Sequence, residues 1–131
     1  MGVLHLSRKL DAAIAEALGN RVVYSENDCD WLAWDGDSDS DWIVPRYSTD
    51  GNAMFELDRE MWKRGYELLM WFTGDKTERW YSVEYALMEK VEEYVENNVT
   101  PDVACHEETE PLARAMAAYL ALTGKEWEEK S

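Results

Sequence analysis

A chain of 131 residues with 28 acids, 13 Lys and Arg and a net charge of −15 is repelled by nucleic acid and by anionic membranes. Its apolar fraction of 46% excludes a disordered acidic tail, and no apolar run reaches the roughly 18 residues of a membrane span. The start lacks the apolar core of a signal peptide, so we expect one soluble, cytoplasmic domain over residues 1–131, with its core in 7–124 and a charged tail in 125–131.

A helix and a group of short strands are predicted for the first third of the chain. Ser7 is the expected N-cap, and Gly19 ends the helix after apolar residues spaced at i, i+4 and i+8. These apolar residues are Leu10, Ile14 and Leu18. Residues 21–24 and 29–34 are rich in β-branched and aromatic side chains and predict two strands, with residues 42–44 as a return strand.

The middle of the chain predicts a second helix followed by a strand. Ser48, Thr49 and Asp50 are alternative N-caps for the helix, and Gly65 ends it after two cations. In residues 66–72, the side chains of both faces of a strand would be largely apolar. We therefore expect a central strand that is covered on both faces.

The last third predicts a returning strand and two helices. Residues 79–86 form the strand, and residues 87–97 have the spacing of a short amphipathic helix. The alternative is a helix that already starts at Ser82 in place of the strand. Thr109 is the expected cap of the last helix, and Gly124 ends it.

The order of these elements predicts an α+β fold. We expect a four-stranded, mostly antiparallel sheet packed with helices, in the order α-β-β-α-β-β-α, with an acidic helical insert before the last helix. Trp62, Trp71 and Trp80 are expected to lie in the core.

Three segments resemble the phage ABA sandwich domain, a family of small, mostly uncharacterised phage and prophage proteins. The segments are the helix Leu10–Leu18, the Pro45–Asp50 stretch with its Tyr-Ser-Thr-Asp sequence, and the Pro-Leu-Ala helix Glu110–Leu120. The resemblance covers roughly residues 8–124, and residues 87–108 are longer than in the family pattern. It implies a phage origin and a bacterial host cytoplasm, and it brings no catalytic residues.

The acids are concentrated in two clusters. Residues 25–45 carry seven acids and no base, and residues 84–110 carry nine acids and only Lys90. We predict a partner-binding surface that includes Glu26, Asp28, Asp30, Asp35, Asp37, Asp39, Asp41, Glu89, Glu92, Glu93 and Glu96, with Trp34 and Trp42 as apolar anchors. On an extended chain, the alternate aspartates of residues 35–41 would point the same way, like phosphates along a strand.

Metal, cofactor and catalytic sites are not indicated. A calcium loop starting at Asp35 would need Gly and Glu at the positions that Ser40 and Arg46 occupy. His5 and His106 have no Cys or His partner at zinc spacing. No motif selects a nucleophile or an acid–base pair, so we expect no cofactor and no enzyme activity. Each of the two cysteines is expected to be a small buried apolar residue.

Charge and resemblance together lead to one main hypothesis. The protein is expected to bind a basic, nucleic-acid-binding host protein, without contacting nucleic acid or membrane itself. The most concrete form is an anti-CRISPR or anti-restriction inhibitor that mimics nucleic acid. The alternative is a small-ligand module with an aromatic pocket formed by residues such as Tyr47, Trp71 and Tyr81. Two further alternatives are a homodimer and a charge that only keeps the protein soluble.

Overall fold

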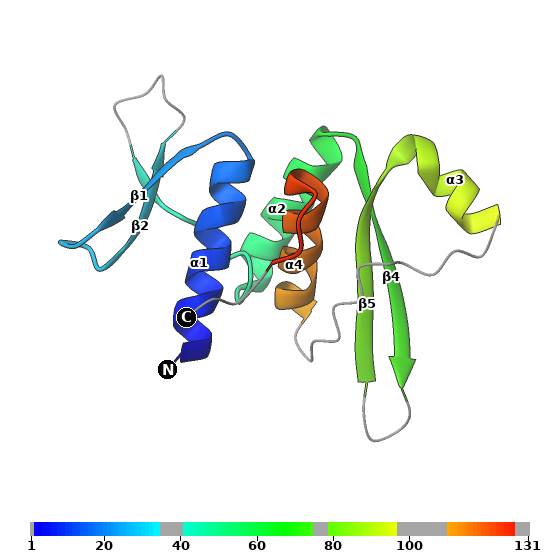
Figure 1. The fold of residues 1–131 in the computed structure, drawn as a ribbon, viewed down its shortest axis with the longest axis horizontal. Helices are drawn as coiled ribbons and strands as arrows, with labels where there is room; N and C mark the ends of the chain where they lie inside the picture. Colours follow the sequence, from blue (N-terminus) through cyan, green and yellow to red (C-terminus); the bar gives the residue numbers. More distant parts are fainter. Residues whose placement is uncertain (1, 35–40, 75–78, 97–109, 128–131) are drawn as a thin grey trace.

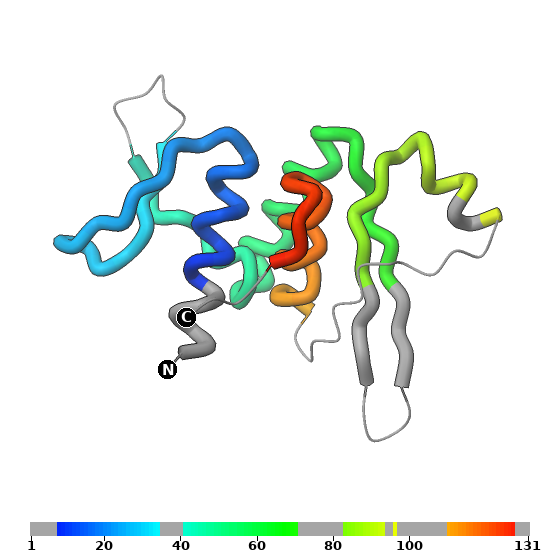
Figure 2. The backbone as a smooth tube through the Cα atoms, viewed as in Figure 1, coloured from blue at the N-terminus to red at the C-terminus, as the bar shows by residue number. Residues whose placement is uncertain are grey.

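The computed structural model describes residues 2–34, 41–74, 79–96 and 110–127, and has an α+β architecture (Figure 1). Side chains are described for 8–34, 41–70, 83–93, 96 and 110–127 (Figure 2). The elements are α1 (Gly2–Ala17), β1 (Arg21–Ser25), β2 (Asp30–Trp34), β3 (Trp42–Ile43), α2 (Gly51–Lys63), β4 (Tyr66–Gly74), β5 (Arg79–Leu87), α3 (Met88–Glu96) and α4 (Glu110–Thr123). The predicted order is therefore confirmed for the described residues except between α1 and α2, where three strands lie in place of the two in the expected order.

Helix α1 starts earlier than the sequence predicted. It begins at Gly2, so the expected N-cap at Ser7 is wrong, because Ser7 continues a helix that already has a turn before it. Its C-terminus is as predicted. Gly19 takes a positive φ of 103°, and the next amide, that of Asn20, donates back to the Ala15 carbonyl at 3.1 Å. This left-handed ending favours glycine, which has no Cβ to strain.

The first sheet has the order β1-β2-β3, and both pairs are antiparallel. Ala33 pairs with Val22 on one side and with Trp42 on the other, and it is fully buried. Cys29 is exposed and has a φ of 52° in the turn before β2, which corrects its expected burial. The β1–β2 register closes at Ser25, so Cys29 falls in the connecting turn and not in the strand.

Helix α2 packs one face into the core. Its buried residues are Ala53, Met54, Leu57 and Met61. Asp50 is the N-cap, and its side chain accepts from the Asn52 amide, so the structure selects one of the three candidates. Trp62 is 58% exposed, and its expected place in the core is wrong. It follows Met61 by one residue, which turns it about 100° away from the core.

The second sheet is the pair β4–β5, which corrects the expected four-stranded sheet. The described strands form two separate sheets, of three and two strands, with the helices α1, α2 and α4 between them (Figure 1). Strand β4 pairs with β5 alone among the described strands, so it is not central. Helix α4 contacts α1, α2 and β5, and occupies the space between the sheets. The side chains of Trp71 and Trp80, which were expected in the core, lie outside the described part of the structure.

Small side chains allow α4 to take this position. Its buried residues are Ala113, Ala115, Ala117 and Ala118. The methyl side chain of alanine is small, so a helix with alanines on several sides can pack closely against several neighbours at once. Helix α3 follows β5 directly, as the short amphipathic helix predicted, and the alternative start at Ser82 is wrong because Ser82 lies in β5. Cys105 and the expected cap Thr109 lie outside the described residues.

Candidate functional site

Asp30, one of the predicted partner-binding acids, is occupied within the fold. Its side chain accepts from the Arg8 guanidinium at 2.7 Å and lies 3.7 Å from that of Arg46. Burial acts to raise the pKa of Asp30, but the Arg8 hydrogen bonds and the two positive charges outweigh it and hold the pKa below its ordinary value. Asp30 therefore stabilises the fold and is not free for a partner.

Arg8 connects α1 to two other segments, and this connection was not predicted from the sequence. Besides Asp30, it donates to Asp11 at 2.8 Å and to the Val44 and Pro45 carbonyls. Asp11 is fully buried and also accepts from the Ser48 amide at 2.8 Å. Burial raises the pKa of Asp11, although these hydrogen bonds and the Arg8 charge oppose the rise. The i, i+3 spacing of Arg8 and Asp11 was the only local signal.

The other residues of the first cluster are spread over the sheet and its loops. Glu26, Asp28 and Asp41 are exposed, and Asp28 accepts from the Ser25 hydroxyl at 2.8 Å. Asp35, Asp37 and Asp39 lie outside the described residues. The first cluster is therefore described only in part, at the edges of the first sheet.

Trp34 and Trp42 lie on different faces of the first sheet. Trp42 pairs with Ala33, and Trp34 is the next residue along β2, so the two indoles point to opposite faces. Trp34 lies under the Arg21 guanidinium, whose carbon is 5.6 Å from the ring centroid. Trp42 is 39% exposed. The structure therefore does not bring these two residues together as one anchor.

Four acids of the second cluster lie on α3, at the other end of the molecule from the first sheet (Figure 1). Glu89, Glu92, Glu93 and Glu96 are all exposed. Their i, i+3, i+4 and i+7 spacing places them along one side of the helix. Glu89, Glu92 and Glu96 form no ion pair with another described side chain. The acids of α3 therefore lie apart from the described acids of the first cluster.

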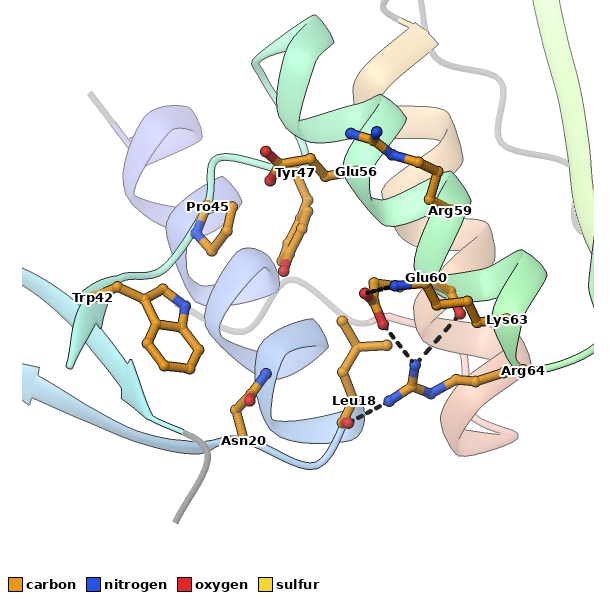
Figure 3. A pocket seen from close by; sticks show the side chains of 10 residues that line it. All are labelled: Leu18, Asn20, Trp42, Pro45, Tyr47, Glu56, Arg59, Glu60, Lys63 and Arg64. Carbon is orange, nitrogen blue, oxygen red and sulfur yellow. Dashed lines mark hydrogen bonds and ion pairs between the residues drawn. The ribbon is translucent and has the colours of Figure 1, made fainter. Parts of the chain in front are cut away.

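A cleft of about 480 Å³ opens between the C-terminal end of α1, β3 and α2 (Figure 3). The residues that line it are Leu18, Asn20, Trp42, Pro45, Tyr47, Glu56, Arg59, Glu60, Lys63 and Arg64. From the sequence, Trp42 and Tyr47 were assigned to other predicted sites, and the cleft was not predicted. The signal in the sequence was three cations within six residues of α2 and its C-cap, in a chain with a net charge of −15.

The charges in the cleft are partly paired with one another. Glu60 accepts from Lys63 at 3.3 Å and from Arg64 at 3.0 Å, and Arg64 also donates to the Leu18 carbonyl. Burial acts to raise the pKa of Glu60, but these two cations outweigh it and lower the pKa. Burial, together with the negative charges of Glu56 and Glu60, raises the pKa of Tyr47 to about 12, so its phenol stays neutral.

Of the residues named for the predicted aromatic pocket, only Tyr47 has a described side chain. Tyr47 lines the cleft, while the side chains of Trp71 and Tyr81 lie outside the described part of the structure. Among the described residues, no three His, Cys, Asp or Glu side chains converge in a way that would hold a metal ion. None of the described helices is long and apolar enough to cross a membrane.

The comparisons found no match to a protein-family model, to a curated protein or to a solved structure. The resemblance to the phage ABA sandwich domain therefore stays a prediction.

Proposed function

We propose that this protein is a non-enzymatic accessory protein that binds a basic, nucleic-acid-binding protein through an acidic surface. The observation that carries the proposal is the row of exposed carboxylates on α3. These are Glu89, Glu92, Glu93 and Glu96, set against the single cation Lys90. Asp30 and Glu60 are paired with cations of the chain, whereas Glu89, Glu92 and Glu96 form no ion pair with another described side chain.

The spacing of the row supports mimicry of nucleic acid. Glu89 and Glu96 are seven residues apart, which corresponds to roughly 10.5 Å along a helix axis. Four carboxylates over that length average one per roughly 3.5 Å, close to the roughly 3.4 Å per phosphate along one strand of B-DNA. A protein that neutralises phosphates with Lys and Arg would therefore meet a similar linear charge density.

The position of α3 also suits a contact surface. The helix follows β5 at one end of the long axis, away from the buried network around Arg8 (Figure 1). A partner can therefore approach the row without disturbing the core. The most concrete form of the proposal is an anti-defence protein, anti-CRISPR or anti-restriction, that occupies the nucleic-acid surface of its target. The predicted phage origin supplies the setting, a bacterial host cytoplasm.

The test is a pulldown from bacterial lysate at about 150 mM salt, where the Debye length is roughly 8 Å. The wild-type chain should enrich one stoichiometric, nucleic-acid-binding complex. The double variant Glu92→Lys/Glu96→Lys should lose it, because it reverses half of the row and places cations in the last turns of α3, where the helix tolerates them.

The matched control is Glu16→Lys/Glu126→Lys, since both residues are exposed and lie outside α3. Each double variant changes the net charge from −15 to −11, so only the position differs. Equal loss in both variants, or equal retention, would contradict a role for α3. A further arm reverses Asp35, Asp37, Asp39 and Asp41. Loss in that arm alone would assign the contact to the first cluster.

A further inference from the structure

We propose that the cleft between α1, β3 and α2 binds a small molecule that carries an anionic group on a planar ring. Its volume of about 480 Å³ lies within the roughly 300–1,000 Å³ of ligand pockets. The site is independent of the α3 row, because it is formed by other elements (Figure 3). Its lining carries three cations and two carboxylates, in a chain whose net charge is −15.

The phenol of Tyr47 is the first sign that the cleft has an occupant. Tyr47 is 6% exposed, and its hydroxyl forms no hydrogen bond with another described residue. Figure 3 shows this hydroxyl pointing into the space between Leu18, Asn20 and Glu60. The ring is held by the fold, so a ligand acceptor that reaches the hydroxyl gains a donor that is already in position. Because the phenol is neutral, it can donate to that acceptor.

The cations of α2 supply the site for the anionic group. Lys63 and Arg64 share the Glu60 carboxylate, and Arg64 also contacts the Leu18 carbonyl. Arg59, one turn earlier, forms no ion pair or hydrogen bond with another side chain that the structure describes. A guanidinium that is left unpaired in this way is suited to a carboxylate or a phosphate, which it can hold with two parallel hydrogen bonds.

The opposite wall of the cleft suits a ring. Trp42 lies there beside Pro45, and it faces the α2 side chains across the opening (Figure 3). The indole remains 39% exposed although it lies on the sheet face that also carries the buried Ala33. A planar ring stacked on it would bury apolar area that is now in water. The ring and the anion are therefore recognised from opposite walls.

The shared chemistry of the ligand has two common sources, nucleotides and aromatic carboxylates. The test is an NMR titration with AMP and with 4-hydroxybenzoate as separate arms, and with adenosine, phenol and inorganic phosphate as references. At least one of the two anionic rings should bind with a dissociation constant below about 1 mM and shift the indole signal that disappears in Trp42→Phe. The arm that binds identifies the source. Each reference should bind at least about tenfold more weakly, because it lacks either the ring or the anion.

Variants separate the two walls. Arg59→Gln should weaken binding about tenfold, since it removes the charge from an exposed helix position. Tyr47→Phe keeps the ring and removes the donor, and should weaken binding roughly two- to tenfold. The matched control is Lys90→Gln, which removes one positive charge on α3 and should leave the dissociation constant unchanged.

Three results would overturn the proposal. They are no binding by either anionic ring, equal binding of a neutral ring or of phosphate alone, and equal affinity of Arg59→Gln and the wild-type chain. Arg59→Gln should also retain the complex in the lysate pulldown, so failure of the cleft is distinguishable from failure of the α3 surface.

Discussion

A buried polar network is the main feature at the residue scale. Arg8 satisfies two carboxylates and two backbone carbonyls, and through them it joins α1 to β2 and to the chain after β3. Asp11, at the centre, also accepts from the backbone amide of Ser48. Removing one member of such a buried charged network strongly destabilises the fold, because the remaining charge stays buried without a partner.

Arg8→Met should lower the free energy of unfolding by about 3–5 kcal/mol, because it leaves Asp11 buried without its cation. Urea unfolding followed by circular dichroism measures the change. Adding Asp11→Asn to this variant should restore part of the loss, which a double-mutant cycle quantifies. Arg21→Met removes an exposed arginine from β1 and is the control, with an expected change below about 1 kcal/mol. An equal loss of stability in both arginine variants would contradict the large contribution that we assign to the network.

Two buried tyrosines predict sensitivity to alkali. Burial raises the pKa of Tyr47 to about 12. Burial, followed by the charge of Asp58 and the hydrogen bond donated to it, also raises the pKa of Tyr85. Above about pH 10 the unfolded chain loses these protons and the folded chain keeps them, so stability falls as pH rises. The Tyr47 contribution, about 3 kcal/mol, is present below pH 10 and is lost by about pH 12.

The measurement is the free energy of unfolding between pH 8 and pH 11, with Tyr47→Phe and Tyr85→Phe compared with the wild-type chain. Each variant should flatten the decline, because a phenylalanine has no proton to lose. Tyr24→Phe is the control, since Tyr24 is exposed on β1. A slope that is identical in all four proteins would contradict the assignment.

At the scale of elements, both tertiary packing and local capping determine where α2 begins. Three consecutive residues were suitable caps, but the amide of Ser48 donates to Asp11 and the residue is buried. Thr49 is exposed one position further on, and Asp50 takes the extended backbone of a cap, with φ −109° and ψ 126°. The Arg8 network therefore holds Ser48 before the helix, and the Asp50 side chain accepts from the Asn52 amide of its first turn.

Asp50→Ala should cost about 1 kcal/mol of stability, within the roughly 0.5–2 kcal/mol measured for N-caps. Thermal unfolding or urea titration measures it. Thr49→Ala, beside it, should change stability by less than about 0.5 kcal/mol. If the two variants were equally destabilised, the cap would not be specific to Asp50.

At the scale of the whole molecule, exposed acids lie at both ends of the long axis. The first sheet lies at one end and α3 at the other, with α1, α2 and α4 between them (Figure 1). Acids of the first cluster that are described are partly bound within the fold, whereas the α3 row is exposed. The cleft lies between α1, β3 and α2 and has an excess of cations. The molecule therefore presents surfaces of different charge to different classes of partner.

Local patterns predicted the elements well. Apolar spacing, capping residues and glycines indicated the helices and strands in the right order, because each depends on contacts within a few residues. The same holds for the α+β class and for the exposed face of α3, where four glutamates share one side of a helix. The exceptions were the start of α1 and the position of Cys29, which depend on the length of the helix and on the strand register.

The arrangement of those elements was decided by long-range packing. Residues 66–72 are apolar on both alternating sets, a pattern that fits a central strand as well as it fits a hairpin covered by α4. Local sequence patterns do not indicate which helix fills the space between two sheets. Helix α4 fills it here, because its buried residues are small alanines. The pairing of Asp30 with Arg8, 22 residues apart, and the cleft around Tyr47 exist only once α1, β3 and α2 are in place. Local order follows from neighbouring residues, whereas sites such as these arise where distant residues meet.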